Sequence, residues 1–137
     1  MTQLDAKLTV GAEHMAVMIE KVDRAMFVRY AGASGDFNPI HWNEEFAKSA
    51  GYPTVFAQGM FTAGVLATFL TNWAGEAAVR RFRTRFVGQV WPGEQITCSA
   101  RVTNVYEQDG ERRADCELSV VNEKGERKID GDATVAI

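Results

Sequence analysis

Met60–Trp73, M-F-T-A-G-V-L-A-T-F-L-T-N-W, is the segment around which the remainder of this chain must be arranged. Apolar residues occur on every side of a helix drawn through it: Met60, Phe61, Ala63, Val65, Leu66, Ala67, Phe69, Leu70 and Trp73. A helix that is apolar all round is buried, and at ~1.5 Å per residue this one spans roughly 20 Å, the interior of a small domain. Gly75 is the expected C-cap. We therefore expect a long central helix that the rest of the chain covers.

After Ala78 the sequence changes to a period of two, the side-chain period of a β-strand. Apolar residues alternate with polar or charged ones in four segments: Phe82–Phe86, Ile96–Val102, Ala114–Val120 and Ala133–Ile137. Turn sequences separate these segments at Trp91–Glu94, Gln108–Gly110 and Glu123–Gly125. Such alternation is typical of antiparallel strands with one solvated face. The apolar face of the resulting sheet can cover the central helix.

The N-terminal part supplies a further strand and two helices. The mixture of residues in His14–Val22 predicts a first strand. Asp23 is a suitable N-cap for a helix that runs to about Ala31, and Asn43 can cap a short helix over Glu44–Lys48. One strand, then helices, then four strands predict an α+β fold, in which an antiparallel sheet of about five strands surrounds the buried helix.

The length and composition are those of one ordinary globular domain over 1–137, with 46% hydrophobic and 24% charged residues. A formal net charge of −3 gives no electrostatic reason to expect nucleic-acid binding. The longest apolar tract, Met60–Leu70, is well short of the ~20 residues that a membrane span needs. Met1–Lys7 has no apolar core of a secretion signal. We expect a cytoplasmic protein that binds neither nucleic acid nor membrane.

Potential chemistry is concentrated in Tyr30–His41, Y-A-G-A-S-G-D-F-N-P-I-H. Pro39 fixes its own φ and moves Asn38 away from helical angles, which predicts an ordered, irregular loop. Such a loop can direct the Asp36 carboxylate and the His41 imidazole at one point. Asp and Asn beside a proline also form turns and caps that carry no chemistry. The combined motif, rather than either residue alone, therefore points to a site.

A family resemblance is carried by three segments: S-G-D-F-N-P-I-H at Ser34–His41, W-N-E-E-F-A at Trp42–Ala47, and A-Q-G-M at Ala57–Met60 before the apolar helix. Together they resemble the MaoC-like, (R)-specific enoyl hydratase ("hydratase 2") family over nearly the whole chain. Tyr30–Trp42 and T-N-W-A-G at Thr71–Gly75 are most similar to the B subunit of bacterial (3R)-hydroxyacyl-ACP dehydratases. The resemblance implies a hot-dog fold, in which an antiparallel sheet wraps a long central helix.

The same resemblance implies a hydro-lyase that interconverts trans-2-enoyl and (R)-3-hydroxyacyl thioesters of CoA or acyl carrier protein (ACP). Asp36 and His41 would form the catalytic dyad that activates water, one as the base and the other as its partner or proton donor. Asn38 and Gly59 would be the substrate-binding residues: the Asn38 amide would hold the loop or orient the dyad, and the Gly59 N–H would face the thioester oxygen. Neither a metal nor another cofactor is expected. Many relatives have histidine where this chain has Gln58, which cannot titrate.

Two other functions are compatible with a hot-dog fold, namely acyl-thioester hydrolysis and a non-catalytic role as the supporting subunit of a dehydratase heterodimer. The loop argues against hydrolysis, and the intact Asp36 and His41 argue against a purely supporting role. A lone five-stranded sheet leaves its edges open. We therefore expect a dimer, either of identical chains or with a related hot-dog subunit.

The remaining reactive residue types receive structural interpretations. His14 has no acidic partner or motif nearby and is expected to be a surface histidine. Cys98 and Cys116 alternate with polar residues and are expected in the core. The densest basic cluster is interpreted either as a solvated outer sheet face or as a contact for CoA phosphates or an acidic ACP; it comprises Arg80, Arg81, Arg83 and Arg85.

Overall fold

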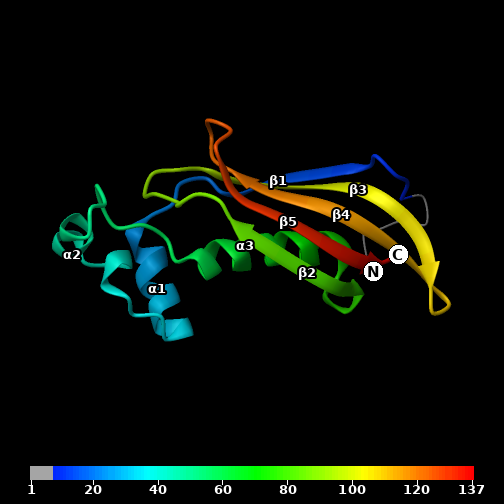
Figure 1. Cartoon of the computed structure of the whole chain (residues 1–137), viewed down its shortest axis with the longest axis horizontal. Helices are drawn as coiled ribbons and strands as arrows, with labels where there is room; N and C mark the ends of the chain where they lie inside the picture. Colours follow the sequence, from blue (N-terminus) through cyan, green and yellow to red (C-terminus); the bar gives the residue numbers. More distant parts are fainter. Residues whose placement is uncertain (1–7) are drawn as a thin grey trace.

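A curved antiparallel sheet packs along one side of a long helix in the computed structural model, which describes residues 8–137 (Figure 1). The expectation about a secretion signal in Met1–Lys7 concerns residues outside this range. The helices are α1 (Arg24–Ser34), α2 (Glu44–Ser49) and α3 (Gly59–Ala74), with 3₁₀ turns at Pro39–His41 and Glu76–Ala78. The strands are β1 (Glu13–Ile19), β2 (Val79–Phe86), β3 (Ile96–Gln108), β4 (Glu111–Val121) and β5 (Arg127–Ala136).

The strand order is β1-β3-β4-β5-β2, and every neighbouring pair is antiparallel. Strands β1 and β2 are therefore the two edges of the sheet. α1 and α2 lie beyond one end of the sheet, beside the start of α3 (Figure 1). The five antiparallel strands and the central helix confirm the predicted α+β, hot-dog architecture.

Within residues 8–137, no helix combines the length and the apolar character that crossing a membrane would require.

α3 packs its apolar side chains against the inner face of the sheet, where Leu66, Phe69 and Leu70 are almost completely buried. Each strand contributes alternate residues to this core, among them Cys98 and Val120. The expectation that α3 is buried on all sides is wrong for one stripe. Met60 is 60% exposed, and Gly64 and Thr68 are exposed one and two turns further on. The sheet covers only one side of the helix, and this stripe lies on the other.

The helix caps confirm the sequence prediction because they depend on local chemistry. Asp23 Oδ1 accepts a hydrogen bond from the Met26 N–H (3.0 Å), and Asn43 Oδ1 accepts one from the Phe46 N–H (3.1 Å). The N–H of Gly75, at φ 90°, donates to Thr71 O (2.8 Å) and ends α3. The first strand ends at Ile19, earlier than predicted, because Val22 bonds through its backbone to Gly93 and Glu94.

His14 is a second correction. Its ring lies on the inner face of β1 and stacks on Phe69 and Trp73, at centroid distances of 5.2 and 5.5 Å. Because β1 is an edge strand, the residue is half-buried rather than on the open surface. Cys98 and Cys116 are core residues as predicted, and burial raises the pKa of their thiols to about 12 and about 11.

Leu66→Ala tests the packing of α3 on the sheet. Because Leu66 is 0% exposed, the substitution should lower the free energy of unfolding by about 2 to 5 kcal/mol. Val28→Ala, at a 57% exposed helical position, is the matched control and should change it by less than about 0.5 kcal/mol. Equilibrium denaturant unfolding measures both, and equal effects would contradict this packing.

Candidate active site

The loop that follows α1 is fixed by its own polar groups. Gly35, at φ 77°, adopts the left-handed conformation that glycine favours, and its N–H donates to Ala31 O (2.9 Å). The Ser34 hydroxyl donates to Tyr30 O (2.7 Å) and accepts from the Asp36 N–H (3.1 Å). These hydrogen bonds therefore fix the backbone that leads from the end of α1 to Asp36.

Asn38 acts as a cap within this loop. Its Oδ1 accepts a hydrogen bond from the Ile40 N–H (3.2 Å), and its N–H donates to Asp36 Oδ1 (3.3 Å). Pro39 occupies the first position of the 3₁₀ turn that ends at His41. These contacts support the predicted loop-holding function of Asn38, and its contact with substrate stays a prediction.

The structure brings the Asp36 carboxylate and the His41 imidazole together. Asp36 Oδ2 lies 3.9 Å from His41 Nε2. The histidine is buried, with 7% of its surface exposed, whereas 45% of the Asp36 side chain is exposed. His41 Nδ1 lies 2.7 Å from the carbonyl oxygen of Phe56. A carbonyl can only accept, so Nδ1 carries the proton, and in the neutral ring the Nε2 lone pair faces Asp36.

This arrangement provides two hydrogen-bond acceptors around one small space. A distance of 3.9 Å is too long for a direct hydrogen bond between Nε2 and Oδ2. A water molecule about 2.8 Å from each atom would donate one hydrogen to each of them. The pair can therefore orient a water and take a proton from it.

Gly59 lies at the first position of α3, where the amides have no acceptor within the helix and the helix dipole favours negative charge. A Cβ at this position would approach the Phe86 ring to 3.3 Å, so glycine allows this ring to pack closely against the start of α3. Beside it is a pocket of about 380 Å³ whose apolar wall includes Phe56, Val90 and Ile129. Phe56 both lines this pocket and bonds through its carbonyl to His41.

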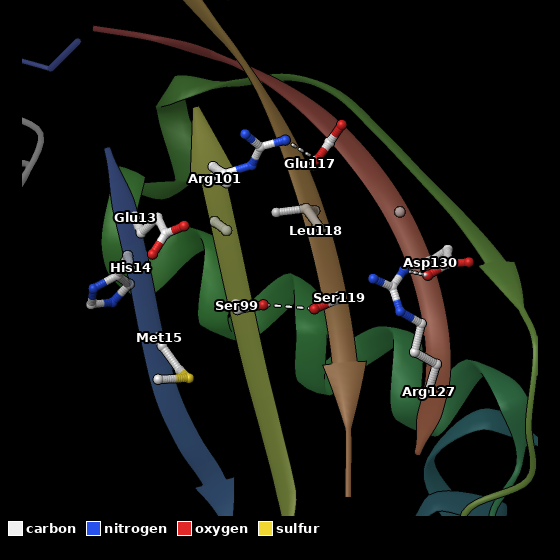
Figure 2. A pocket seen from close by; sticks show the side chains of 12 residues that line it. Glu13, His14, Met15, Ser99, Arg101, Glu117, Leu118, Ser119, Arg127 and Asp130 are labelled. Carbon is white, nitrogen blue, oxygen red and sulfur yellow. Dashed lines mark hydrogen bonds and ion pairs between the residues drawn. The ribbon is translucent and has the colours of Figure 1, made fainter. Parts of the chain in front are cut away.

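A larger hollow of about 500 Å³ lies on the outer face of the sheet (Figure 2). Its floor carries Ser99 and Ser119, whose hydroxyls are 2.6 Å apart. Two ion pairs lie around it, Arg101 with Glu117 and Arg127 with Asp130. Neither Asp36 nor His41 lines this hollow, so the largest volume and the candidate dyad lie in different places.

Gln58 and Phe56 are the site residues whose contacts sequence reasoning missed. Gln58 is completely buried; its Nε2 donates to Phe27 O (2.9 Å), which joins the start of α3 to α1. Its Oε1 has no hydrogen-bond partner within the described residues. Phe56 contacts His41 through its backbone carbonyl. Every residue has such a carbonyl, so the residue type at position 56 could not predict this contact. The proline and glycine around residues 53–59 could only have indicated an ordered connection.

The basic cluster on β2 is compensated by acidic residues of β5 and β4. Arg81 and Arg83 both pair with Asp132, at 2.6 and 2.9 Å. Arg80 pairs with Glu111 at 2.7 Å, and this guanidinium, helped by that of Arg113, lowers the pKa of Glu111 to about 2. A phosphate contact by these arginines stays a prediction.

Within residues 8–137, no group of three or more His, Cys, Asp or Glu side chains is arranged to hold a metal ion.

Comparison with known proteins gives a family match over most of the chain. The model of the MaoC like domain matches residues 5–125. The 3-hydroxybutyryl-CoA dehydratase of Methylorubrum extorquens is 29% identical over 123 residues, which are 88% of this chain and 76% of that protein. The fatty acid synthase subunit beta of Aspergillus oryzae is 37% identical over 75 residues, 53% of this chain. The chain spans only 4% of that subunit's length.

Solved structures share the fold. An (R)-hydratase from A. caviae superposes with a TM-score of 0.83 at 22% identity, covering 96% of this chain and 98% of that one. The truncated HadBC (3R-hydroxyacyl-ACP dehydratase) complex from Mycobacterium tuberculosis gives a TM-score of 0.69 at 18% identity, covering 93% and 96%. At identities of 22% and 18%, these structures show that the fold is shared and nothing more.

The hydrogen bond from His41 to Phe56 can be tested without substrate. Neutral His41 should be the tautomer with the proton on Nδ1, because the Phe56 carbonyl accepts only from that atom. Long-range ¹H–¹⁵N NMR spectra distinguish the two ring nitrogens, and His41→Asn assigns the signals against those of His14. A neutral His41 protonated on Nε2 would contradict the geometry described here.

Proposed function

The chain belongs to the MaoC-like domain family, and from this premise we propose that it catalyses the reversible hydration of trans-2-enoyl thioesters to (R)-3-hydroxyacyl thioesters. The observation that carries the proposal is the 3.9 Å separation of His41 Nε2 and Asp36 Oδ2, with the imidazole oriented by Phe56. The name of the Methylorubrum extorquens relative, 3-hydroxybutyryl-CoA dehydratase, supports the same reaction class.

In the proposed mechanism one water is held between His41 Nε2 and Asp36 Oδ2. As the water oxygen bonds to C3 of the enoyl thioester, one of its protons passes to the dyad. The electron pair of the C2–C3 double bond moves towards the thioester carbonyl, and the protonated dyad then supplies the proton to C2. C3 thus receives the hydroxyl group of the water and C2 receives its proton, and the dyad returns to its starting protonation state. The reverse sequence dehydrates the hydroxyacyl thioester.

Charge that develops on the thioester oxygen needs hydrogen-bond donors. We assign this function to the Gly59 N–H, since it opens α3 and lies beside the apolar pocket. The pocket of about 380 Å³ would receive apolar parts of the substrate. The chemistry proposed for the dyad uses no metal or redox cofactor, and either CoA or ACP can carry the acyl group.

The proposed enzyme acts as a dimer. Both edge strands, β1 and β2, have one unpaired side. The exposed stripe of α3 adjoins an open apolar groove of about 440 Å³ lined by Tyr30, Phe61 and Val65. A second hot-dog subunit would cover these surfaces, and the HadBC structure is named as a complex. The partner is either a second copy of this chain or a related subunit.

The dyad predicts a specific pattern of kinetic loss. Wild-type protein should hydrate crotonyl-CoA or a longer enoyl-CoA to the (R)-3-hydroxy product, with loss of the ultraviolet absorbance of the enoyl thioester. Asp36→Asn and His41→Ala should each lower kcat by at least ~10²-fold, the scale of a lost acid or base. The double variant should be little worse than the single ones, because both residues act on one water.

Circular dichroism of the variants controls for folding. A folded Asp36→Asn or His41→Ala protein with nearly wild-type kcat would refute the dyad. Release of free thiol without formation of the hydroxy product would instead identify a thioesterase.

Static light scattering of the chain expressed alone tests the assembly. We expect a particle of twice 15.2 kDa that is active, or an inactive chain that becomes active when it is co-expressed with a related hot-dog subunit. An active, well-behaved monomer would contradict the proposed dimer.

A further inference from the structure

A buried charged cluster lies outside the dyad. Lys128 is 3% exposed and Glu94 is 8% exposed, and Lys128 Nζ lies 2.9 Å from Glu94 Oε2. Asn122, which is 5% exposed, donates to the same carboxylate oxygen. Charges removed from water are costly, and a well-packed apolar pair of similar volume is often at least as stable. Stability alone therefore does not account for an ion pair at this place.

The cluster fixes the backbone of the connection between β2 and β3. Residues 87–95 contain neither helix nor strand, so regular hydrogen-bond ladders do not determine their path. Lys128 Nζ donates to Gln89 O (2.8 Å), and Glu94 Oε1 accepts from the Trp91 N–H (2.6 Å). An apolar pair could fill the same volume but could not bond these two backbone groups. The charges thus help to set the shape of an irregular loop, together with the backbone bonds of Gly93 and Glu94 to Val22.

That loop lies at the same end of the sheet as α1 and α2 (Figure 1) and holds the segment 56–59. Val90 O accepts from the Ala57 N–H (2.9 Å). The Trp91 ring contacts the Phe56 ring at a centroid distance of 5.4 Å. Phe56 O in turn accepts from His41 Nδ1. A continuous series of contacts therefore leads from the buried ion pair to the imidazole.

We propose that Lys128 and Glu94 are positioning residues, which hold the 87–95 loop so that segment 56–59 orients the His41 imidazole and the Gly59 N–H. The proposal rests on the proposed function. A displacement of catalytic groups by about 1 Å can cost up to about 10²-fold in rate. The ion pair acts through the loop and touches neither member of the dyad.

The double variant Glu94→Gln/Lys128→Met tests this, because it removes the ion pair and the bond from Lys128 Nζ to Gln89 O and leaves no charge buried without a partner. Glutamine at position 94 can still accept from the Trp91 N–H, so the loss isolates the ion pair and the Lys128 bond. The double variant should unfold at nearly the wild-type denaturant midpoint. Its kcat should fall about tenfold or more; because Lys128 also lines the pocket beside Gly59, the substrate-free measurement that follows is the one that reports on positioning. Without substrate, the Ala57 amide should exchange with deuterated solvent at least about tenfold faster.

Arg101→Met/Glu117→Gln is the matched control. It removes an ion pair with the same 2.9 Å separation from the exposed face of the sheet, away from the loop. Its kcat and its Ala57 exchange should equal those of the wild type. Trp91→Ala, at a half-exposed position, leaves the ion pair in place but removes the ring contact with Phe56. It should also lower kcat and accelerate exchange, and it keeps the test decisive if the double variant does not fold.

A folded Glu94→Gln/Lys128→Met protein with wild-type kcat and wild-type Ala57 exchange would overturn the proposal. So would wild-type values in Trp91→Ala if the double variant does not fold. Failure of the wild-type chain, in its active assembly, to hydrate enoyl thioesters would refute the proposed function instead. The exchange measurement would then still show whether the ion pair holds segment 56–59.

Discussion

The hydrogen bond from His41 Nδ1 to the carbonyl of Phe56 is the contact on which the candidate site depends. It joins two segments that are separate in the sequence, the loop after α1 and the connection into α3. It also determines which ring nitrogen faces Asp36. Because the same connection continues into Gly59, one buried hydrogen bond links the proposed water-binding pair, Asp36 and His41, to the start of α3. The hot-dog fold brings the two segments together, and this hydrogen bond orients the His41 imidazole relative to Asp36.

The sequence was sufficient wherever a local rule determines the structure. Asp23 and Asn43 cap helices because their short side chains reach the N–H groups three residues ahead. The alternation after Ala78 predicted four strands because successive side chains of a strand point to opposite faces. The spacing of Asp36 and His41 around Pro39 correctly placed both side chains at one point. Their catalytic function is still an inference from chemistry and family.

What the sequence could not supply depends on which surfaces meet in space. Phe56 O is a backbone acceptor, which every residue type has, so the identity of residue 56 could not predict its hydrogen bond to His41. The exposed stripe through Met60 and Thr68 exists because the sheet covers one side of α3, and a hydrophobic pattern cannot show which side that is. His14 stacks on two core rings because it lies on the inner face of β1, against α3. The partner of Lys128 could not be found either, since Glu94 is distant in the chain.

The central claim is that one water occupies the space between His41 and Asp36, and a high-resolution crystal structure of the active assembly tests it most directly. The account predicts an ordered water about 2.8 Å from both His41 Nε2 and Asp36 Oδ2, with Nδ1 still bonded to the Phe56 carbonyl. A direct hydrogen bond between the two side chains, or a water bonded to only one of them, would contradict it.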